Sequence, residues 1–297
     1  PGDRCAYCSK TLEQLDNPLK RCMGCSIVLY CSKTCQRSAW RNHRPFCHSP
    51  SASSEVDPAA YRSLGFASLM DLSMSLKEWA RIHDYAFGVI MQITLYLNGG
   101  VESNFASPRA AVIHAEIRVR NDADMSPASL FRFKGVEVVG KDERHYLSSK
   151  WDYLEQSRAR RTEEVRRSGS DQTFVGSLPA VFILHVEDIG TITAHHAFPI
   201  YRPQSHDLDE STRLAFLDLM HLCGAGITAG FSYHRPSRPM HAPEVYQWVL
   251  SAKKKWRPVQ IKDWNWDINM GNTMAQHPDH YKSGLQPLML WSTFRNL

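Results

Sequence analysis

Seven of the chain's eight cysteines lie in its first 47 residues, and only Cys223 lies outside this segment. Together with one histidine they follow the spacing C-x2-C-x13-C-x2-C-x5-C-x3-C-x7-H-x3-C. Zinc binds thiolate and imidazole donors in sets of four, and a C-x2-C pair lets one tight turn present two sulfurs to one ion. Eight donors therefore predict two tetrahedral zinc sites. The predicted ligands are Cys5, Cys8, Cys22, Cys25, Cys31, Cys35, His43 and Cys47.

A disulfide framework is the alternative explanation of these cysteines. Seven cysteines would leave one unpaired, and disulfides have no use for a histidine at a fixed offset. No secretory signal segment is visible in the sequence, although its start at Pro1 suggests a trimmed or incomplete N-terminus. His48 competes with His43 as a ligand, but it directly follows Cys47, and adjacent residues rarely reach one metal. We therefore favour zinc, with His43 as the histidine ligand.

The second half of this segment resembles the MYND finger almost position for position. The matching positions are Tyr30, Cys31, Ser32, Cys35, Gln36, Trp40, His43 and Cys47. The resemblance covers about a sixth of the chain. This sequence departs from the family at Ala39, where members often have an acidic residue, and in the long loop 9–21. Neither departure touches a ligand.

The resemblance implies an interleaved, cross-braced arrangement of the two ions. One ion would be bound by Cys5, Cys8, Cys31 and Cys35. The other would be bound by Cys22, Cys25, His43 and Cys47. A segment of about 45 residues buries too little apolar surface to fold unaided, so we expect metal binding to supply most of its folding free energy. Eight protein ligands leave no open coordination position, so both ions are expected to be structural.

The resemblance also implies a function, because similar fingers act as adaptors that bind peptides of Pro-x-Leu-x-Pro type. The groove residues of the family correspond here to Gln36 and Trp40, and residues 26–30 would supply a neighbouring strand edge. A proline-rich peptide is preorganised and extended, and an aromatic face contacts it at low entropic cost. The alternative role for Trp40 is to pack the small core between the two metals.

Charge gives little support to nucleic-acid binding. The whole chain carries 35 basic and 30 acidic residues, a mild surplus for its length. Residues 1–48 have a formal charge of +5, which seven thiolates and two divalent ions lower to about +2. A nucleic-acid-binding regulator is therefore a second choice for this module.

Beyond the finger, composition predicts a second domain. Residues 49–54 are small and polar, as is typical of a flexible linker. We predict a zinc finger over 1–48, a linker over 49–56 and an α+β domain over 57–297. The role of this domain is not indicated by its sequence.

Periodicity and capping residues predict the elements of that domain. Helices are expected from Asp57-Pro58 to Gly65, from Ser68 to Gly99-Gly100, over 142–167, from Asp207 to a stop at Gly224, and over 243–255. Strands are expected over 111–119, 130–139 and 181–186. The apolar run 85–97 is too short to span a bilayer.

No catalytic motif stands out. A SET-type lysine methyltransferase is the enzyme to test, because one branch of that family carries an inserted MYND finger, but no Asn-His-Ser or Gly-Glu-Glu-Leu segment is found. The 224–229 segment fits G-x-G-x-x-A but follows a predicted helix, so it indicates a turn. His83, the 195–196 pair and the histidines of 277–280 are expected in the core or on the surface, and Cys223 is expected to be a buried small hydrophobe.

Trp264 and Trp266 predict either an exposed binding patch or a half-buried strand. Taken together, the sequence predicts an intracellular adaptor, nuclear or cytoplasmic, rather than an enzyme. Its expected cofactor is zinc, as two structural ions. Its expected partners are proline-containing peptide segments of other proteins, with transcriptional regulation as the expected setting, and neither a membrane nor nucleic acid is expected. The SET-type methyltransferase is the alternative.

Overall fold

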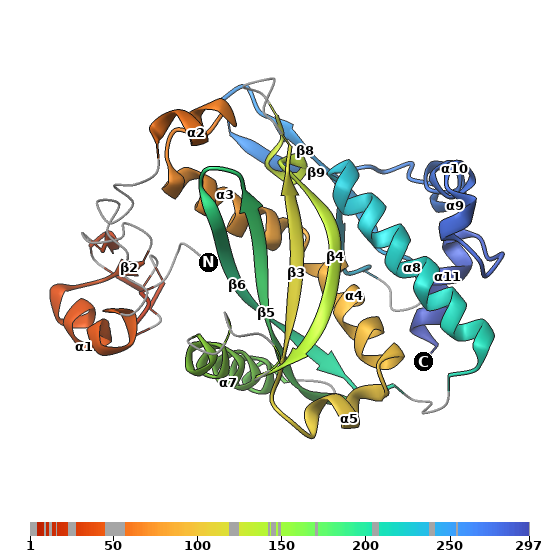
Figure 1. Ribbon diagram of the computed structural model, residues 1–297, viewed down its shortest axis with the longest axis horizontal. Helices are drawn as coiled ribbons and strands as arrows, with labels where there is room; N and C mark the ends of the chain where they lie inside the picture. The colour runs from red at the N-terminus through yellow and green to blue at the C-terminus, as the bar shows by residue number, and fades with distance from the viewer. Residues whose placement is uncertain are drawn as a thin grey trace. The chain divides into compact units, whose positions relative to one another are not determined.

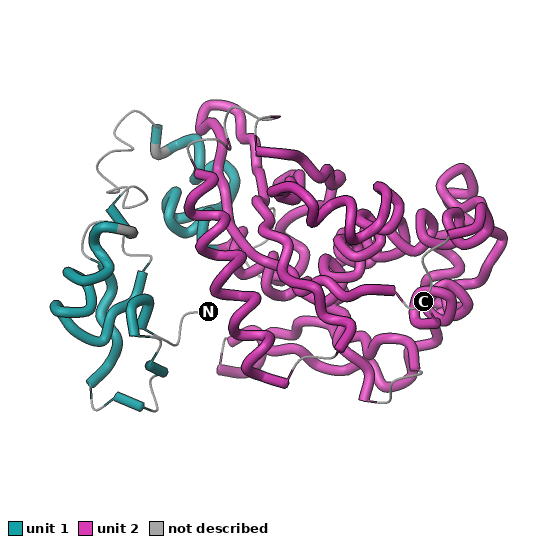
Figure 2. The backbone as a smooth tube through the Cα atoms, turned by 90° about the horizontal axis from the view of Figure 1, so that it is seen from below, with its two compact units in different colours: residues 1–74 teal, residues 75–297 magenta. Residues whose placement is uncertain are grey.

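The structure is a computed structural model that divides into two compact units, residues 1–74 and residues 75–297 (Figure 2). It describes residues 5–8, 10–11, 14–15, 17–22, 28–44, 57–118, 125–141, 143, 147, 150–169, 172–203, 208–237, 241–253 and 255–296. The division falls within helix α3 (Leu69–Ile82). The predicted linker over 49–56 lies outside the described residues, so the domain limits stay predictions.

The first unit contains four short elements, β1 (Lys20–Arg21), β2 (Leu29–Tyr30), α1 (Lys33–His43) and α2 (Pro58–Ser63). The first three belong to the segment of the predicted zinc ligands. Helix α2 begins as Asp57-Pro58 predicts, since the Asp57 carboxylate accepts from the Ala59 N–H at 2.8 Å.

The helix expected from Ser68 begins with a capping box, formed by Ser68 and Asp71 at the start of α3. The Ser68 hydroxyl accepts from the Asp71 N–H at 3.1 Å, and the Asp71 carboxylate accepts from the Ala67 N–H at 3.0 Å. Two otherwise orphaned donors are thereby satisfied.

The helix predicted to continue to residue 98 is interrupted. Helix α3 ends at Ile82 and α4 (Asp84–Leu97) begins after His83. His83 is fully buried, and its Nε2 lies 2.8 Å from the Ala128 carbonyl oxygen. His83 is thus a core residue with a backbone partner, as predicted, and helical periodicity alone did not reveal the break at this position.

A four-stranded sheet forms the centre of the second unit (Figure 1). Its strands are β3 (Arg109–Ile117), β4 (Phe131–Gly140), β5 (Phe174–Val186) and β6 (Gly190–Tyr201), in the order β4-β3-β5-β6. Strands β3 and β5 are parallel, and the other two pairings are antiparallel. The predicted mixed α+β fold is confirmed.

Helices cover both faces of this sheet. Helix α7 (Trp151–Arg167) packs on one face, and α4 and α8 (Glu210–Ala229) pack on the other. Helix α7 begins later than the predicted residue 142. It is exposed along much of its length, as its charges predict, but it buries Trp151 and Leu154 against the sheet. The core on that side consists of Ala110, Val112, Val139, Leu147, Trp151, Leu154, Val181 and Ile183.

The face toward α4 carries an aromatic core. Phe87 and Phe182 have ring centroids 5.0 Å apart, and both lie near Trp79, at 5.3 and 6.2 Å. On the other face of the sheet, Val112 of β3 is buried toward α7. Helix α7 therefore makes the first half of β3 a two-sided core strand.

Helix α8 extends past the predicted stop at Gly224 and ends at Ala229, where Gly230 has a φ of 85°. Two positions inside α8 are glycine because side chains of other elements approach the helix backbone closely there. A Cβ on Gly226 would lie 1.7 Å from the Tyr233 hydroxyl oxygen, and one on Gly224 would lie 2.9 Å from the Phe133 ring. The N-cap of α8 is Asp209, whereas Asp207, where the helix was predicted to begin, lies outside the described residues.

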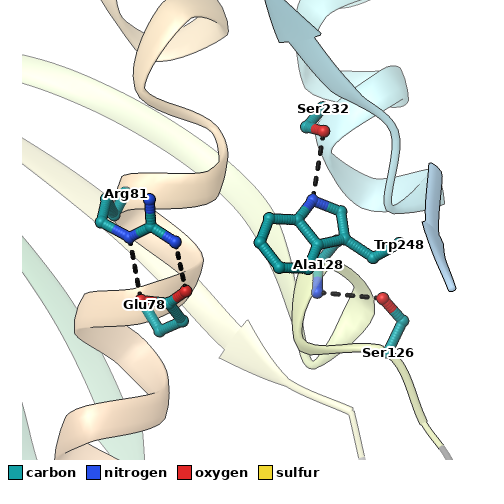
Figure 3. A network of polar contacts seen from close by, with 6 residues as sticks. All are labelled: Glu78, Arg81, Ser126, Ala128, Ser232 and Trp248. Atoms are coloured by element: carbon teal, nitrogen blue, oxygen red, sulfur yellow. Dashed lines mark hydrogen bonds and ion pairs between the residues drawn. The ribbon is translucent and has the colours of Figure 1, made fainter. Parts of the chain in front are cut away.

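The helix predicted over 243–255 is wrong. Residues of this segment form β8 (Glu244–Leu250), the central strand of a second sheet with β7 (Ser232–His234) and β9 (Trp256–Gln260). Alternating burial and a content of Val, Tyr and Trp suit a strand. Figure 3 shows the Trp248 indole N–H donating to the Ser232 hydroxyl, which ties β8 to β7.

The remaining elements are short. They are α5 (Gly100–Phe105), η4 (Pro127–Ser129), α9 (Trp266–Asn269), α10 (Gly271–Gln276), η5 (Pro278–His280) and α11 (Pro287–Arg295). Asn265 caps α9, so Trp264 and Trp266 form neither a strand nor an exposed patch. Trp266 is buried, with its ring 5.3 Å from that of Trp291. Among the described helices, none combines the length and the hydropathy that crossing a membrane requires.

Candidate metal centre

The hairpin and helix of the first unit bring distant cysteines together. Strands β1 and β2 pair Lys20 with Tyr30, and the Cys22 N–H donates to the Val28 carbonyl at 2.7 Å. Helix α1 starts immediately after Cys31, because the Ser32 hydroxyl accepts from the Cys35 N–H at 3.1 Å. Cys31 therefore directly precedes the N-cap residue of α1, and Cys35 lies in the first turn of the helix.

Four cysteine sulfurs form one compact group. The Sγ atoms of Cys5, Cys8, Cys31 and Cys35 all lie within 4.8 Å of one another. The Cys8–Cys31 and Cys31–Cys35 sulfur distances are 3.5 and 3.4 Å. Four thiolates around zinc at about 2.3 Å would be about 3.8 Å apart, so the group fits a tetrahedral zinc ion.

The electrostatics of this group also favour a cation. Burial acts to raise the pKa of Cys5, but hydrogen bonds from the backbone N–H groups of Cys8, Cys31 and Tyr7 outweigh it and lower that pKa to about 6. The contact with Cys35, together with burial, raises the pKa of Cys31. Zinc binds the thiolate form of cysteine, so metal binding at this group would be accompanied by loss of the Cys31 proton.

The second predicted group is represented by Cys22 and His43. Both are buried, and the His43 Nε2 lies 3.3 Å from the Cys22 sulfur. Burial lowers the pKa of His43 and so favours the neutral imidazole that binds metals. Cys25 and Cys47, the other two predicted ligands, lie outside the described residues. Within the described residues, only the four-cysteine group gathers three or more donors.

Trp40 and Gln36 lie one turn apart on α1 but in different environments. Trp40 is 42% exposed, and its ring centroid is 5.8 Å from that of His43. The small core of the finger is formed by Cys5, Cys22 and Tyr30. Trp40 therefore flanks His43 and remains accessible.

Gln36 makes a contact that the spacing did not indicate. Its Nε2 donates to the Cys22 sulfur at 3.6 Å. Gln36 directly follows Cys35 in sequence, yet its contact is with the hairpin cysteine of the other predicted group. Only the packing of α1 on the hairpin could reveal this.

The predicted strand edge is partly occupied. Residues 26 and 27 lie outside the described residues, and the Leu29 carbonyl accepts from the Ala6 N–H at 2.9 Å. The Leu29 carbonyl is therefore not available to pair with the backbone of a bound peptide, and side chains are the recognition surface at this position.

These elements define a small zinc-binding finger, and sequence comparison gives its family. The model of the MYND finger family matches residues 5–47, so this part of the chain is a MYND finger, and zinc is its metal. The chain also resembles "Histone-lysine N-methyltransferase ASHR1" of Arabidopsis thaliana, with 46% identity over 44 residues. That match covers 15% of this chain and only 8% of the plant protein. No solved structure matches the chain.

The other histidines considered from the sequence have ordinary roles. His195 and His196 are adjacent on β6 and so point to opposite faces, where His195 lies near Tyr153 and His196 bonds the Asp84 carboxylate at 2.7 Å. His277 and His280 stack at 5.8 Å without gathering a third donor among the described residues. Cys223 is fully buried, which raises its thiol pKa.

Proposed function

We propose that this finger binds two structural zinc ions and docks proline-containing peptides of partner proteins. The first ion is bound by Cys5, Cys8, Cys31 and Cys35. The second is bound by Cys22, Cys25, His43 and Cys47. The pairing of Cys22 with His43 supports the second site. Such an adaptor suits an intracellular setting, where thiols stay reduced, and transcriptional regulation is the process we assign it to.

The exposed Trp40 carries the peptide-docking proposal. A tryptophan that is 42% exposed beside a metal site offers a broad apolar face that does not support the core of the finger. An extended proline-rich segment stacks on such a face with little loss of entropy. Contact with the Cys22 sulfur orients the Gln36 amide, so that its carbonyl end can accept from a peptide N–H.

Calorimetric titration of the zinc-loaded full chain with a Pro-x-Leu-x-Pro peptide tests the proposal. Trp40→Ala is expected to weaken binding at least about tenfold, as for an interface hot spot. Both proteins should hold two zinc ions by metal analysis. Tyr7→Ala is the matched control, since Tyr7 is a 55% exposed aromatic of the same finger outside α1. Equal loss in both variants, or no binding by the parent chain, contradicts the proposal.

The name of the plant relative favours one second candidate, a protein methyltransferase. The match is 44 residues long, the size of a single finger, and so gives no support for a catalytic domain. Saturable binding of S-adenosylmethionine to the full chain would favour this candidate over the adaptor.

A further inference from the structure

A pocket of about 370 Å³ lies within the second unit. Its volume falls in the range of small-molecule sites, about 300–1,000 Å³, and exceeds what an inorganic ion needs. The lining comes from three places in the chain, the first turn of α4, the segment that follows β7 and the last turn of α11. The lining residues are Tyr85, Arg235, Pro236, Ser237 and Arg295. Two guanidinium groups and a phenol therefore meet in one pocket, and none of these lining residues is acidic.

Tyr85 and Arg295 lie next to each other in this pocket. The Tyr85 ring centroid is 6.5 Å from that of Trp291, which is buried one turn before Arg295 on α11. A hydrogen bond joins the Arg295 guanidinium to the Tyr85 phenol. Because a guanidinium only donates, the phenol oxygen is the acceptor and its own O–H is left to donate to a ligand. Burial raises the pKa of Tyr85 against the opposing effect of Arg295, so the phenol keeps its proton at neutral pH.

Arg235 brings a second guanidinium to the same phenol. Its charge, like that of Arg295, acts to lower the pKa of Tyr85. The segment that carries Arg235 is fixed on both sides by Glu244, which pairs with His234 in the second sheet and whose carboxylate accepts from the Ser237 N–H at 3.3 Å. Arg235 itself is exposed and forms no ion pair with an acidic residue in the part of the chain that the structure describes. Its guanidinium is therefore accessible to a ligand.

The charges around the pocket favour an anion. Glu244 contacts the lining, but its carboxylate already accepts from the Ser237 N–H and hydroxyl and from the Tyr246 hydroxyl, the last at 3.0 Å. The hydrogen bonds from Ser237 and Tyr246 lower the pKa of Glu244, so this residue stays ionised at neutral pH. Asp84 of α4 bonds His196 on β6, at 2.7 Å. With Glu244 counted against the two guanidinium groups, one positive charge remains for a ligand to match.

We propose that this pocket binds a small organic phosphate monoester. Its three donor groups, the guanidinium groups of Arg235 and Arg295 and the O–H of Tyr85, match the three terminal oxygens of a phosphoryl group. A phosphate monoester carries a charge of about −1.5 to −2 at pH 7, and guanidinium groups bind such oxygens strongly. A carboxylate offers only two oxygens and one charge, so it matches this donor set less well. The remaining volume, with Pro236 in the lining, accommodates the organic group.

Calorimetric titration of the full chain with phenyl phosphate tests the proposal. Phenyl sulfate is the matched control ligand, because it has the same shape and three terminal oxygens but a single charge. We expect phenyl phosphate to bind and to raise the melting temperature, and phenyl sulfate to bind at least about threefold more weakly. Absence of phenyl phosphate binding, or equal affinity for the two ligands, overturns the proposal. A phosphoserine peptide that binds at least about tenfold more tightly than phenyl phosphate also overturns it, because the ligand would then be a phosphorylated protein.

Variants locate the site. Arg235→Gln is expected to weaken phenyl phosphate binding by about tenfold or more, as for a hydrogen bond to a charged group, while the melting temperature of the free protein stays unchanged. Tyr85→Phe keeps the ring and removes only the O–H, so a loss of about threefold or more is expected. Arg213→Gln is the matched control, since Arg213 is an exposed arginine of α8 outside the lining. Binding that survives both pocket substitutions, or that falls equally with Arg213→Gln, overturns the proposal.

Discussion

The zinc finger and the sheet-centred second unit are stabilised by different interactions. Among the described residues of the finger, the buried hydrophobic core consists of Cys5, Cys22 and Tyr30. The second unit buries a large aromatic core on one face of its sheet and an aliphatic one on the other. Metal ligation therefore replaces apolar burial in the finger, and the same perturbation should affect the two regions very differently.

Removal of zinc should give the largest difference. A strong chelator is expected to unfold residues 5–44, because binding free energies of about 10–16 kcal/mol per structural zinc act as folding free energy. Amide hydrogen exchange should show loss of protection there and unchanged protection at 86–96 in α4. Equal loss in both regions, or none in the finger, would contradict the comparison.

Truncation of the aromatic core should have the reverse effect. Phe182→Ala is expected to lower the free energy of unfolding of the second unit by about 3–5 kcal/mol, because it leaves a cavity beside Trp79 and Phe87. Urea unfolding measures this loss, and zinc content should stay unchanged. Leu217→Ala is the control, since Leu217 is 42% exposed and its loss should cost within about 0.5 kcal/mol.

Acid should weaken the second unit through a buried histidine. Burial lowers the pKa of His83 to about 4, below its ordinary value of 6.5. Between pH 6.5 and 4 the unfolded chain binds a proton that the folded chain refuses, so stability falls by up to about 3 kcal/mol as pH falls through this window. Urea unfolding between pH 7 and 4 should be less pH-dependent in His83→Phe.

The His83→Phe substitution should remove only part of the pH dependence of stability, because His195 also contributes to it. Burial also lowers its pKa, to about 3, so it contributes acid sensitivity of the same sign. An unchanged pH slope in His83→Phe would show that His83 is not the group responsible.

Replacing either of two helix-interior glycines of the second unit by alanine adds one methyl group, and the two substitutions should have opposite effects on stability. Gly226→Ala is expected to cost about 1–3 kcal/mol or more, since its Cβ would overlap the Tyr233 hydroxyl. Gly88→Ala on α4 should be stabilising by up to about 1 kcal/mol, because its Cβ meets only Phe198 at 4.0 Å. Similar effects of the two substitutions in thermal unfolding would contradict this close packing.

How far the sequence predicted the molecule also differs between the regions. The zinc motif could be predicted from the sequence because the coordination chemistry of the metal imposes ligand types and spacing. The helix N-caps at Asp57 and Ser68 could be predicted because each involves only residues close together in the sequence. The helix expected over 243–255 was wrong because pairing with both β7 and β9 makes residues 244–250 the central strand of a sheet. The stop expected at Gly224 was wrong because that glycine accommodates Phe133, from a different element.

The sequence by itself determined the zinc-binding character of the finger, its expected ligands and the mixed nature of the second unit. Only the tertiary structure decided which sulfurs meet, and that Trp40 stays outside the small core while Gln36 contacts Cys22. The physical reason is that local spacing and capping are written in consecutive residues, whereas convergence of side chains depends on contacts between segments far apart in the chain.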